Sequence, residues 1–354
     1  MDAGVATAAE RQSQVDAVLA RLFSLARKRA EPLGDAYLSL WDSIEAATTG
    51  GKRFRPRMVF AAYESLGGTD REAAAYVGAA FELLHTSLCV HDDVIDRDFV
   101  RRGLPNVSGT FKDRAVAAGV DTAAAEHHGI SAAVIAGDLA LFNAYRLIDK
   151  SGVGDSTRGR LLEVMDEALF ASAAGELIDI DFALQAHAPH VDDILAMERL
   201  KTAVYSFEGP LQAGAILAGA PEETVATLGE FGREIGIAYQ LVDDVLGVFG
   251  AEAETGKTTI GDLREGKRTV LIAYASSAPG WEELSALFGD PALDEEGAAR
   301  LRAHLVQSGA REFAEGLARY YANRALARLV EPHIPASLRA ELHPVADAIL
   351  GRVK

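Results

Sequence analysis

The stretch FELLHTSLCVHDDVIDRDFVRR, residues 81–102, joins a run of apolar residues to a dense group of carboxylates and ends in two arginines. As a helix of about 3.6 residues per turn, it places Asp92 and Asp96 about 40° apart on one face. The same face, within about 40° of Asp92, carries Leu88, His85 and Phe81. Clustered carboxylates repel one another unless a cation neutralises them, and such oxygen-rich groups suit Mg²⁺, which completes its coordination with water and phosphate oxygens. The stretch therefore predicts a helix with a magnesium-binding end.

A second acidic pair, Asp243 and Asp244, lies in QLVDDVLG, residues 240–247. Basic residues accompany the acidic ones: the run GGKRFRP at residues 50–56 and the residue after it contain Lys52, Arg53, Arg55 and Arg57. In a chain of net charge −17 this run is a local exception, and guanidinium groups bind phosphate oxygens in a bidentate manner. Acidic residues for a metal and basic residues for phosphate together predict an enzyme that acts on diphosphates.

Composition restricts the class of protein further. Hydrophobic residues make up 49% of the 354 residues and aromatic residues only 7%, and the abundant Ala and Leu favour helices. The charge of −17 disfavours binding to nucleic acid or to anionic membranes. A single cysteine, Cys89, excludes a disulfide within the chain and fits a reducing cytoplasm, which is the predicted location.

Apolar runs and the amino-terminal residues bear on membrane association. Residues 1–12 lack the basic and apolar segments of a signal peptide. The longest apolar runs, residues 73–81 and 213–220, fall short of the roughly 20 residues that a membrane helix needs. We therefore expect no stable membrane anchor.

Helical periodicity covers most of the chain and predicts an all-α fold, a single domain (1–354) of about a dozen helices. The predicted helices are residues 15–29, 57–66, 72–94, 131–148, 157–184, 192–218, 221–250, 301–330 and 336–350. Three stretches are predicted as loops: residues 102–129 as a flexible insertion, 251–268 as an active-site lid, and 276–281.

Several polar residues are placed where they can serve a phosphate site. Lys201 lies in an otherwise apolar helix and needs a partner, and Thr202 adds a hydroxyl. Gln240 precedes Asp243 by three residues and so shares its helix face. His85, taken alone, is more often a buried core residue, but its shared face with Asp92 favours phosphate binding.

These segments resemble, in order and spacing, the trans-isoprenyl diphosphate synthases, also called polyprenyl synthetases. The segments are GGKRFRP (50–56), HTSLCVHDDVIDRDFVRRGLP (85–105), KT (201–202), QLVDD (240–244), TGK (255–257) and GKRT (266–269). The resemblance implies the isoprenoid synthase fold, with helices around a central cavity. It also implies a homodimer and three Mg²⁺ ions held by Asp92, Asp96 and Asp243. It implies an allylic-diphosphate site formed by Arg101, Lys201, Thr202, Gln240, Lys257 and Lys267. The diphosphate of isopentenyl diphosphate would be bound by Lys52, Arg55, His85 and Arg102, with Arg53 as a neighbour.

The implied chemistry is ionisation, condensation and elimination. The allylic substrate (dimethylallyl, geranyl or farnesyl diphosphate) loses its diphosphate, the double bond of isopentenyl diphosphate attacks the cation, and a proton leaves. Among the implied residues, Asp92, Asp96, Asp243, Lys201 and Arg101 would take part in the ionisation.

Two features concern metal binding and product length. Many members of the family carry a third Asp in the second motif, where this chain has Gly247. Ser87 and Leu88 occupy the positions at which farnesyl synthases carry an aromatic residue, and Phe81 or Leu84 would limit the product deeper in the tunnel. The prediction is geranylgeranyl diphosphate, with farnesyl or longer polyprenyl diphosphates as the alternatives.

Two other functions remain as rivals. A class I terpene cyclase also carries an Asp-rich helix, but its second motif needs a hydroxyl and a Glu where this chain has Gly247 and Ala251. A non-catalytic subunit of a heteromeric synthase is the rival outside the enzymes, and the intact first motif argues against it.

Overall fold

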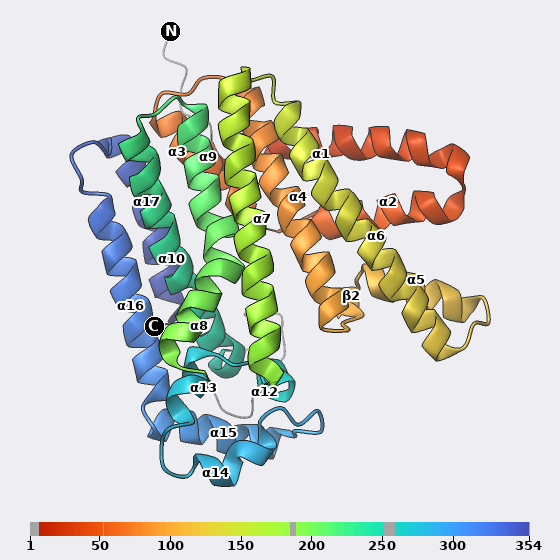
Figure 1. Cartoon of the computed structure of the whole chain (residues 1–354), viewed down its shortest axis with the longest axis vertical. Coiled ribbons are helices and arrows are strands. Elements are labelled where there is room, and N and C mark those ends of the chain that lie inside the picture. The colour runs from red at the N-terminus through yellow and green to blue at the C-terminus, as the bar shows by residue number, and fades with distance from the viewer. Residues whose placement is uncertain (1–6, 52, 185–188, 251–258, 354) are drawn as a thin grey trace. The chain divides into compact units, whose positions relative to one another are not determined.

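The computed structural model describes residues 7–51, 53–184, 189–250 and 259–353, and this part of the chain is mostly helical (Figure 1). Strands in the described residues are limited to one hairpin, β1 (Val100–Arg101) and β2 (Leu104–Pro105). The predicted all-α class is confirmed. The chain divides into two compact units, one with Met1–Met165 and Gln212–Ala220, the other with Asp166–Leu211 and Pro221–Lys354.

The first unit is organised around α4 (Arg71–Ile95), which packs side by side with α6 (Thr122–Asp149) (Figure 1). The carboxylate of Asp70 accepts a hydrogen bond from the Ala73 amide (3.0 Å) and caps the start of α4. Apolar side chains are buried on several sides of α4, as is usual for a central helix. The unit also contains α1 (Ala8–Ala30), η1 (Glu31–Leu33), α2 (Asp35–Thr48), α3 (Phe54–Ser65) and α5 (Val107–Ala117).

Residues 102–129, predicted as a flexible insertion, are largely helical, because they form α5 and the start of α6 after the hairpin. The prediction of a loop was wrong, because two helix caps in this stretch start helices. Asn106 accepts a hydrogen bond from the Gly109 amide (2.8 Å), and Asp121 accepts one from the Ala124 amide (3.2 Å). Both are N-cap contacts that satisfy the otherwise unpaired amides of a first helical turn.

The second unit is organised around α10 (Glu222–Phe249), which packs against α16 (Ala310–Arg328) and against a ten-residue π-helix, η2 (Arg199–Glu208). Two helices begin in one unit and end in the other, α7 (Asp155–Leu184) and α9 (Gly209–Leu217). The other elements are α8 (Val191–Glu198), α12 (Gly261–Glu265), α13 (Val270–Ala275), α14 (Trp281–Leu284), η3 (Ser285–Leu287), α15 (Glu295–Gln307), α17 (Ala336–Leu350) and η4 (Gly351–Val353).

Two long predicted helices are divided in the structure. The stretch 192–218 consists of α8, η2 and α9, because the helical hydrogen bonding changes to the π pattern in its middle. The stretch 301–330 is broken at Gly309, whose φ of 79° is left-handed and belongs to the conformations that glycine tolerates best. Helix α2 was not predicted.

Two helices, α4 and α6, are long and apolar enough to cross a membrane by length and composition, which the short apolar runs did not indicate. In α4, 78% of the apolar window is buried within the protein, and in α6 the share is 44%. One or two such helices are weak evidence, because the core helix of a globular protein passes the same test. The expected lack of a membrane anchor stays a prediction.

Candidate active site

The first aspartate pair lies in the last turn of α4 and is closed by an arginine from the following hairpin. Arg102 and Gly103 both have positive φ (56° and 75°), as in the two-residue turns that join tight hairpins. The turn directs Arg101 back to the helix, with Nη2 2.7 Å from Asp93 Oδ1 and 3.1 Å from Asp92 Oδ2. The side chain of Asp93 is 7% exposed and that of Asp92 28%. Burial raises the pKa of Asp93, and Arg101 opposes this shift.

Asp96 lies one turn beyond Asp92 and is exposed. Its amide donates a hydrogen bond to the Asp92 carbonyl (2.9 Å), so the helical turn extends to Asp96. The two carboxylates therefore lie on one side of the helix end, as the periodicity predicted. Their role as metal ligands stays a prediction.

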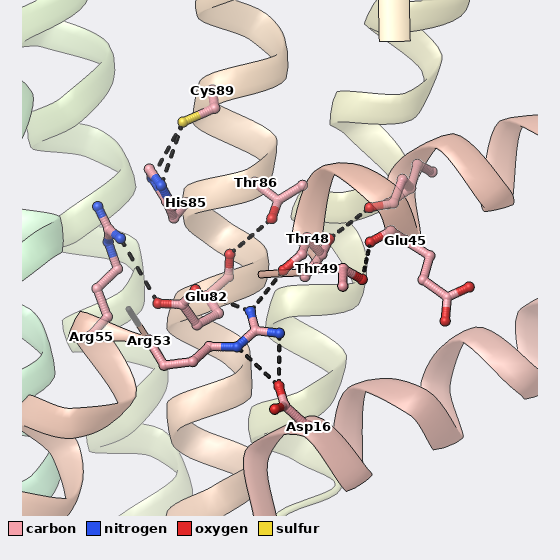
Figure 2. Close-up of polar contacts among 11 residues, drawn as sticks. Asp16, Glu45, Thr48, Thr49, Arg53, Arg55, Glu82, His85, Thr86 and Cys89 are labelled. Carbon is pink, nitrogen blue, oxygen red and sulfur yellow. Dashed lines mark hydrogen bonds and ion pairs between the residues drawn. The ribbon is translucent and has the colours of Figure 1, made fainter. Parts of the chain in front are cut away.

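A basic segment at the start of α3 faces the middle of α4. Arg55 Nη1 lies 3.8 Å from Glu82 Oε1, and His85 follows Glu82 by one turn (Figure 2). The close approach depends on Gly78, because a Cβ there would lie 3.0 Å from Pro56 Cβ. Burial holds the pKa of His85 well below its usual range, and the charge of Arg55 adds to the shift. The imidazole is therefore neutral at neutral pH.

The four residues predicted to set product length are largely buried in α4. Phe81, Leu84 and Ser87 are fully buried, and Leu88 is half-buried. The Ser87 hydroxyl donates a hydrogen bond to the Gly137 carbonyl of α6 (2.9 Å). Ser87 therefore faces α6, and an aromatic side chain at this position would have to displace that helix or turn away from it.

The second aspartate pair lies on α10 and, like the first, has one member that is more exposed and one that is buried. The side chain of Asp243 is 45% exposed and that of Asp244 only 4%. Asp244 Oδ1 accepts hydrogen bonds from Gln240 Nε2 (2.9 Å) and Lys267 Nζ (3.2 Å). The Asp244 carboxylate raises the pKa of Lys267 well above its usual value, against the effect of burial. Asp243 Oδ1 lies 3.3 Å from Arg352 Nη2, near the carboxyl end of the chain.

Lys201 lies in the π-helix, where its ammonium group contacts two carboxylates of α7. Nζ is 2.7 Å from Asp179 Oδ2 and 3.0 Å from Glu176 Oε2. Thr202 follows it and is half-buried. A Cβ at Gly175 of α7 would lie 2.3 Å from the Lys201 amide nitrogen, so the two backbones meet closely here. π-Helical segments occur frequently at functional sites, which agrees with the predicted role of this lysine.

Two carboxylates of this region were not predicted from the sequence. Glu198 is 3% exposed, no described hydrogen-bond donor reaches its carboxylate, and burial, followed by the charge of Asp244, raises its pKa well above the usual value. Asp262 of α12 stands over Gly247, because a Cβ at Gly247 would lie 2.2 Å from Asp262 Oδ2. The available signal for Glu198 was its position in the predicted helix 192–218, three residues before Lys201. The stretch that contains Asp262 gave no periodicity to interpret.

The donor atoms fit magnesium when each aspartate pair is considered by itself. In the described part of the chain, no group of three or more His, Cys, Asp or Glu side chains could hold a metal ion. This is compatible with Mg²⁺, which commonly takes one or two carboxylates and leaves its other positions to water and substrate phosphates. Lys52, Lys257 and the first eight residues of the predicted lid (251–258) lie outside the described residues.

A family model described as polyprenyl synthetase matches residues 39–302. The chain belongs to the polyprenyl synthetase family. A geranylfarnesyl diphosphate synthase of Aeropyrum pernix is 35% identical over 319 residues, which cover 88% of this chain and 93% of that relative. A geranylgeranyl diphosphate synthase of Sulfolobus acidocaldarius is 32% identical over 288 residues, or 79% of this chain and 81% of that relative.

Solved structures of polyprenyl synthetases agree with the fold. A geranylgeranyl pyrophosphate synthase of Corynebacterium glutamicum, complexed with isoprenyl diphosphate and magnesium, has a TM-score of 0.87 at 29% identity and covers 96% of this chain and 99% of its own. A polyprenyl synthase of Caulobacter crescentus, complexed with calcium and isoprenyl diphosphate, has a TM-score of 0.77 at 27% identity, with 99% of each chain covered. The predicted isoprenoid synthase fold is confirmed.

Proposed function

We propose that this polyprenyl synthetase is a magnesium-dependent prenyltransferase that adds isopentenyl diphosphate to an allylic diphosphate, with geranylgeranyl diphosphate as its main product. The observation that carries the proposal is the construction of the two aspartate pairs. Each has a partly exposed carboxylate, Asp92 or Asp243, beside a buried one that is bound to a cation, Arg101 or Lys267. The ionisation of a diphosphate ester requires accessible carboxylates that bind metal and positively charged side chains, held in place, that bind phosphate.

Asp92, Asp96 and Asp243 would hold the metal, three Mg²⁺ ions by the family resemblance. Bound Mg²⁺ supplies positive charge to the departing diphosphate. By the same resemblance, Arg101, Lys201 and Lys267 would donate hydrogen bonds to the diphosphate of the allylic substrate, with Thr202, Gln240 and Lys257 as further ligands. The allylic C–O bond breaks with its electron pair on the diphosphate. The double bond of isopentenyl diphosphate then forms the new C–C bond, and the proton lost in the last step passes to the released diphosphate.

Isopentenyl diphosphate would be bound through its diphosphate by Lys52, Arg55, His85 and Arg102. The neutral imidazole of His85 suits this role, because a neutral ring can donate one hydrogen bond to phosphate without competing with the arginines for charge. Apolar side chains along the predicted tunnel face of α4 would exclude water from the reacting cation.

A longer product, geranylfarnesyl diphosphate, is the second candidate, favoured by the similarity to the synthase of Aeropyrum pernix that carries that name. Ser87 and Leu88 leave the upper wall of the predicted tunnel without an aromatic ring, which favours products longer than farnesyl diphosphate. Phe81, about 16 Å from Asp92 along the helix axis, would limit the chain.

Product analysis by mass spectrometry tests the proposal. The purified chain is incubated with Mg²⁺, isopentenyl diphosphate and, in separate reactions, dimethylallyl, geranyl or farnesyl diphosphate. We expect a twenty-carbon product from all three, and a twenty-five-carbon product would select the second candidate. Release of diphosphate without chain growth would indicate a cyclase, and lack of turnover a non-catalytic subunit.

The homodimer and the single domain are further proposals. On α6, Ile135 and Phe142 are 52% and 64% exposed, and large exposed apolar side chains on one helix mark interfaces. We propose that a second copy of the chain covers these side chains, and light scattering of Phe142→Glu tests this, with a monomer as the expected result.

The family match over residues 39–302 includes parts of both units, which supports one synthase domain.

A further inference from the structure

Arg53 was predicted as a neighbour of the isopentenyl diphosphate site, and its guanidinium group is surrounded by acceptors of the protein itself. Nε and Nη2 lie 3.0 Å and 2.8 Å from Asp16 Oδ1 on α1, and Nη1 donates to the Thr48 carbonyl of α2 (2.7 Å). Nη1 also lies 3.3 Å from Glu82 Oε2 on α4 (Figure 2). The side chain is only 7% exposed. Its donors therefore join three helices of the first unit.

The backbone of Arg53 agrees with a fixed position. Its φ of 46° and ψ of 47° are left-handed, a conformation that costs about 1 kcal/mol or more for a residue other than glycine. Such a conformation persists only where the surrounding structure determines it, and here the bonds to Asp16, Thr48 and Glu82 do so. Two residues later, Arg55 lies in the first turn of α3.

Glu82 is the buried carboxylate between the two arginines, with a side chain that is 9% exposed. Oε2 is bound to Arg53, and Oε1 lies 3.8 Å from Arg55 Nη1 (Figure 2). The second distance is longer than a hydrogen bond, so the contact with Arg55 is ionic. One carboxylate offsets the repulsion between two guanidinium groups that burial would otherwise strengthen. Glu82 is also one helical turn from His85, on the same face.

We infer that Arg53 and Glu82 are positioning residues that hold Arg55 in place for the isopentenyl diphosphate, and that Arg53 is not itself a ligand of the diphosphate. The inference rests on the proposed function of this site. Arg53 fixes the carboxylate of Glu82 from one side, and the carboxylate then draws Arg55 toward α4 from the other. Removal of the Glu82 charge takes away the buried carboxylate that draws the Arg55 guanidinium toward α4, so Arg55 is expected to move.

Calorimetric titration with isopentenyl diphosphate tests this without requiring turnover, so failure of the proposed reaction and failure of this inference are distinguishable. We expect Glu82→Gln to weaken binding about tenfold, the loss of one charge-assisted contact at Arg55. The dissociation constant of the allylic diphosphate, measured in the same way, should stay within about twofold of wild type, since the predicted allylic ligands are different residues. Where Glu82→Gln does not fold, Glu82→Asp keeps the charge but shortens the side chain and gives the same comparison.

A double-mutant cycle separates positioning from a general effect on the fold. If Glu82 acts through Arg55, Glu82→Gln adds no further loss of isopentenyl diphosphate binding when Arg55→Gln is already present. Glu167→Gln, on an exposed site of α7, is the matched control and should leave binding unchanged. Equal losses in the presence and absence of Arg55 would overturn the inference, and so would unchanged binding in Glu82→Gln.

Discussion

Asp93 and Asp244 are the buried second members of the two aspartate pairs, and each holds a cation, Arg101 in the first unit and Lys267 in the second. The exposed first members, Asp92 and Asp243, are left at the surface of their helices. Because burial of a lone carboxylate is costly, the buried member is stable only with its cation, and the cation is fixed in return. In the proposed function, each pair therefore combines a carboxylate that would bind metal with a carboxylate that positions a cation for phosphate.

The pairs differ in where their further carboxylate comes from. The first is completed by Asp96, one turn along the same helix. At the second, the corresponding position is Gly247, and the carboxylate of Asp262 stands over it from α12. The first arrangement is local in sequence and the second is not. A carboxylate therefore lies beside the position of the missing acid, and it comes from a residue outside the two aspartate motifs.

The largest effect on turnover is expected from substitutions in the two aspartate pairs, where the first members should differ from the buried second members. Asp92→Asn and Asp243→Asn should each lower kcat by about 10²–10³-fold, because charge stabilisation in the transition state is lost. Asp93→Asn and Asp244→Asn should act mainly through Arg101 and Lys267, with losses of about tenfold and a lower melting temperature. Steady-state kinetics at saturating Mg²⁺, with thermal unfolding for each variant, makes the measurement. Equal losses of activity in all four variants would contradict the distinction between the partly exposed and the buried aspartates.

The second test exchanges the carboxylate between Gly247 and Asp262. Gly247→Asp alone should lower activity about tenfold or more, because the new side chain meets Asp262 Oδ2 and adds a like charge beside it. Asp262→Ala alone should weaken Mg²⁺ binding about tenfold, measured by titration in the presence of inorganic diphosphate. The double variant, which returns one carboxylate to α10, should recover most of that affinity.

Gly247→Ala is the control for this exchange, because it adds the Cβ without the charge. The Asp262 side chain can rotate away from one methyl group, so Gly247→Ala should cost less than Gly247→Asp. If Gly247→Asp matched wild type in Mg²⁺ affinity and in activity, the carboxylate of Asp262 would have no role at the second pair.

The contrast between local and non-local contacts also explains what could be predicted. Helical periodicity gave α4, the shared face of Asp92 and Asp96, and the all-α class, because each depends on neighbours within a turn or two. The contacts of Glu82 with Arg53, and of Asp262 with Gly247, join residues that are far apart in the chain. Periodicity carries no information about such pairs. The π-helix at Lys201 was missed for a similar reason, since its pattern depends on packing against α7 and α10.

The third test concerns the second unit, where backbone packing around the π-helix fixes Lys201. Gly175→Ala places a Cβ 2.3 Å from the Lys201 amide nitrogen, and a backbone atom cannot rotate away as a side chain can. We expect turnover to fall severalfold and the free energy of unfolding to fall by about 1–3 kcal/mol. Gly159→Ala, on the same helix with nothing within 4 Å of its Cβ, is the matched control. It should be neutral or stabilising, since Ala favours helix over Gly.

Contact between Gly175 and the π-helix would be unimportant for Lys201 if both alanine variants retained wild-type turnover and the same KM for the allylic diphosphate. A loss of stability in Gly175→Ala with unchanged kinetics would assign this contact to packing alone. Arg55, His85 and Arg102, the predicted ligands of isopentenyl diphosphate, lie on α3, on α4 and in the hairpin turn, so neither glycine variant should change the binding of that substrate.

The smallest effect on turnover is expected at Glu198, a buried acid beside Asp244 of the second pair. Its pKa in the folded chain is raised above the usual 4.5 by burial and by Asp244, so the folded state holds a proton that the unfolded state has released. The free energy of unfolding therefore falls as the pH rises from about 4.5 toward the raised pKa, by at most about 1.4 kcal/mol per pH unit for one proton. Because the side chain of Glu198→Gln cannot ionise, the variant should not show this fall in the free energy of unfolding.

Chemical denaturation at several pH values between about 4.5 and 8 measures the difference. Relative to wild type, Glu198→Gln should gain stability with rising pH, whereas Glu167→Gln, an exposed substitution on α7, should follow the wild-type curve. Turnover of Glu198→Gln should stay within about threefold of wild type, because Asp244 and Lys267 keep their contact. Parallel curves for Glu198→Gln and wild type would mean that Glu198 is ionised in the folded chain. Lys267 would then be shared between two carboxylates, and the second pair would differ from the first in charge as well as in its third carboxylate.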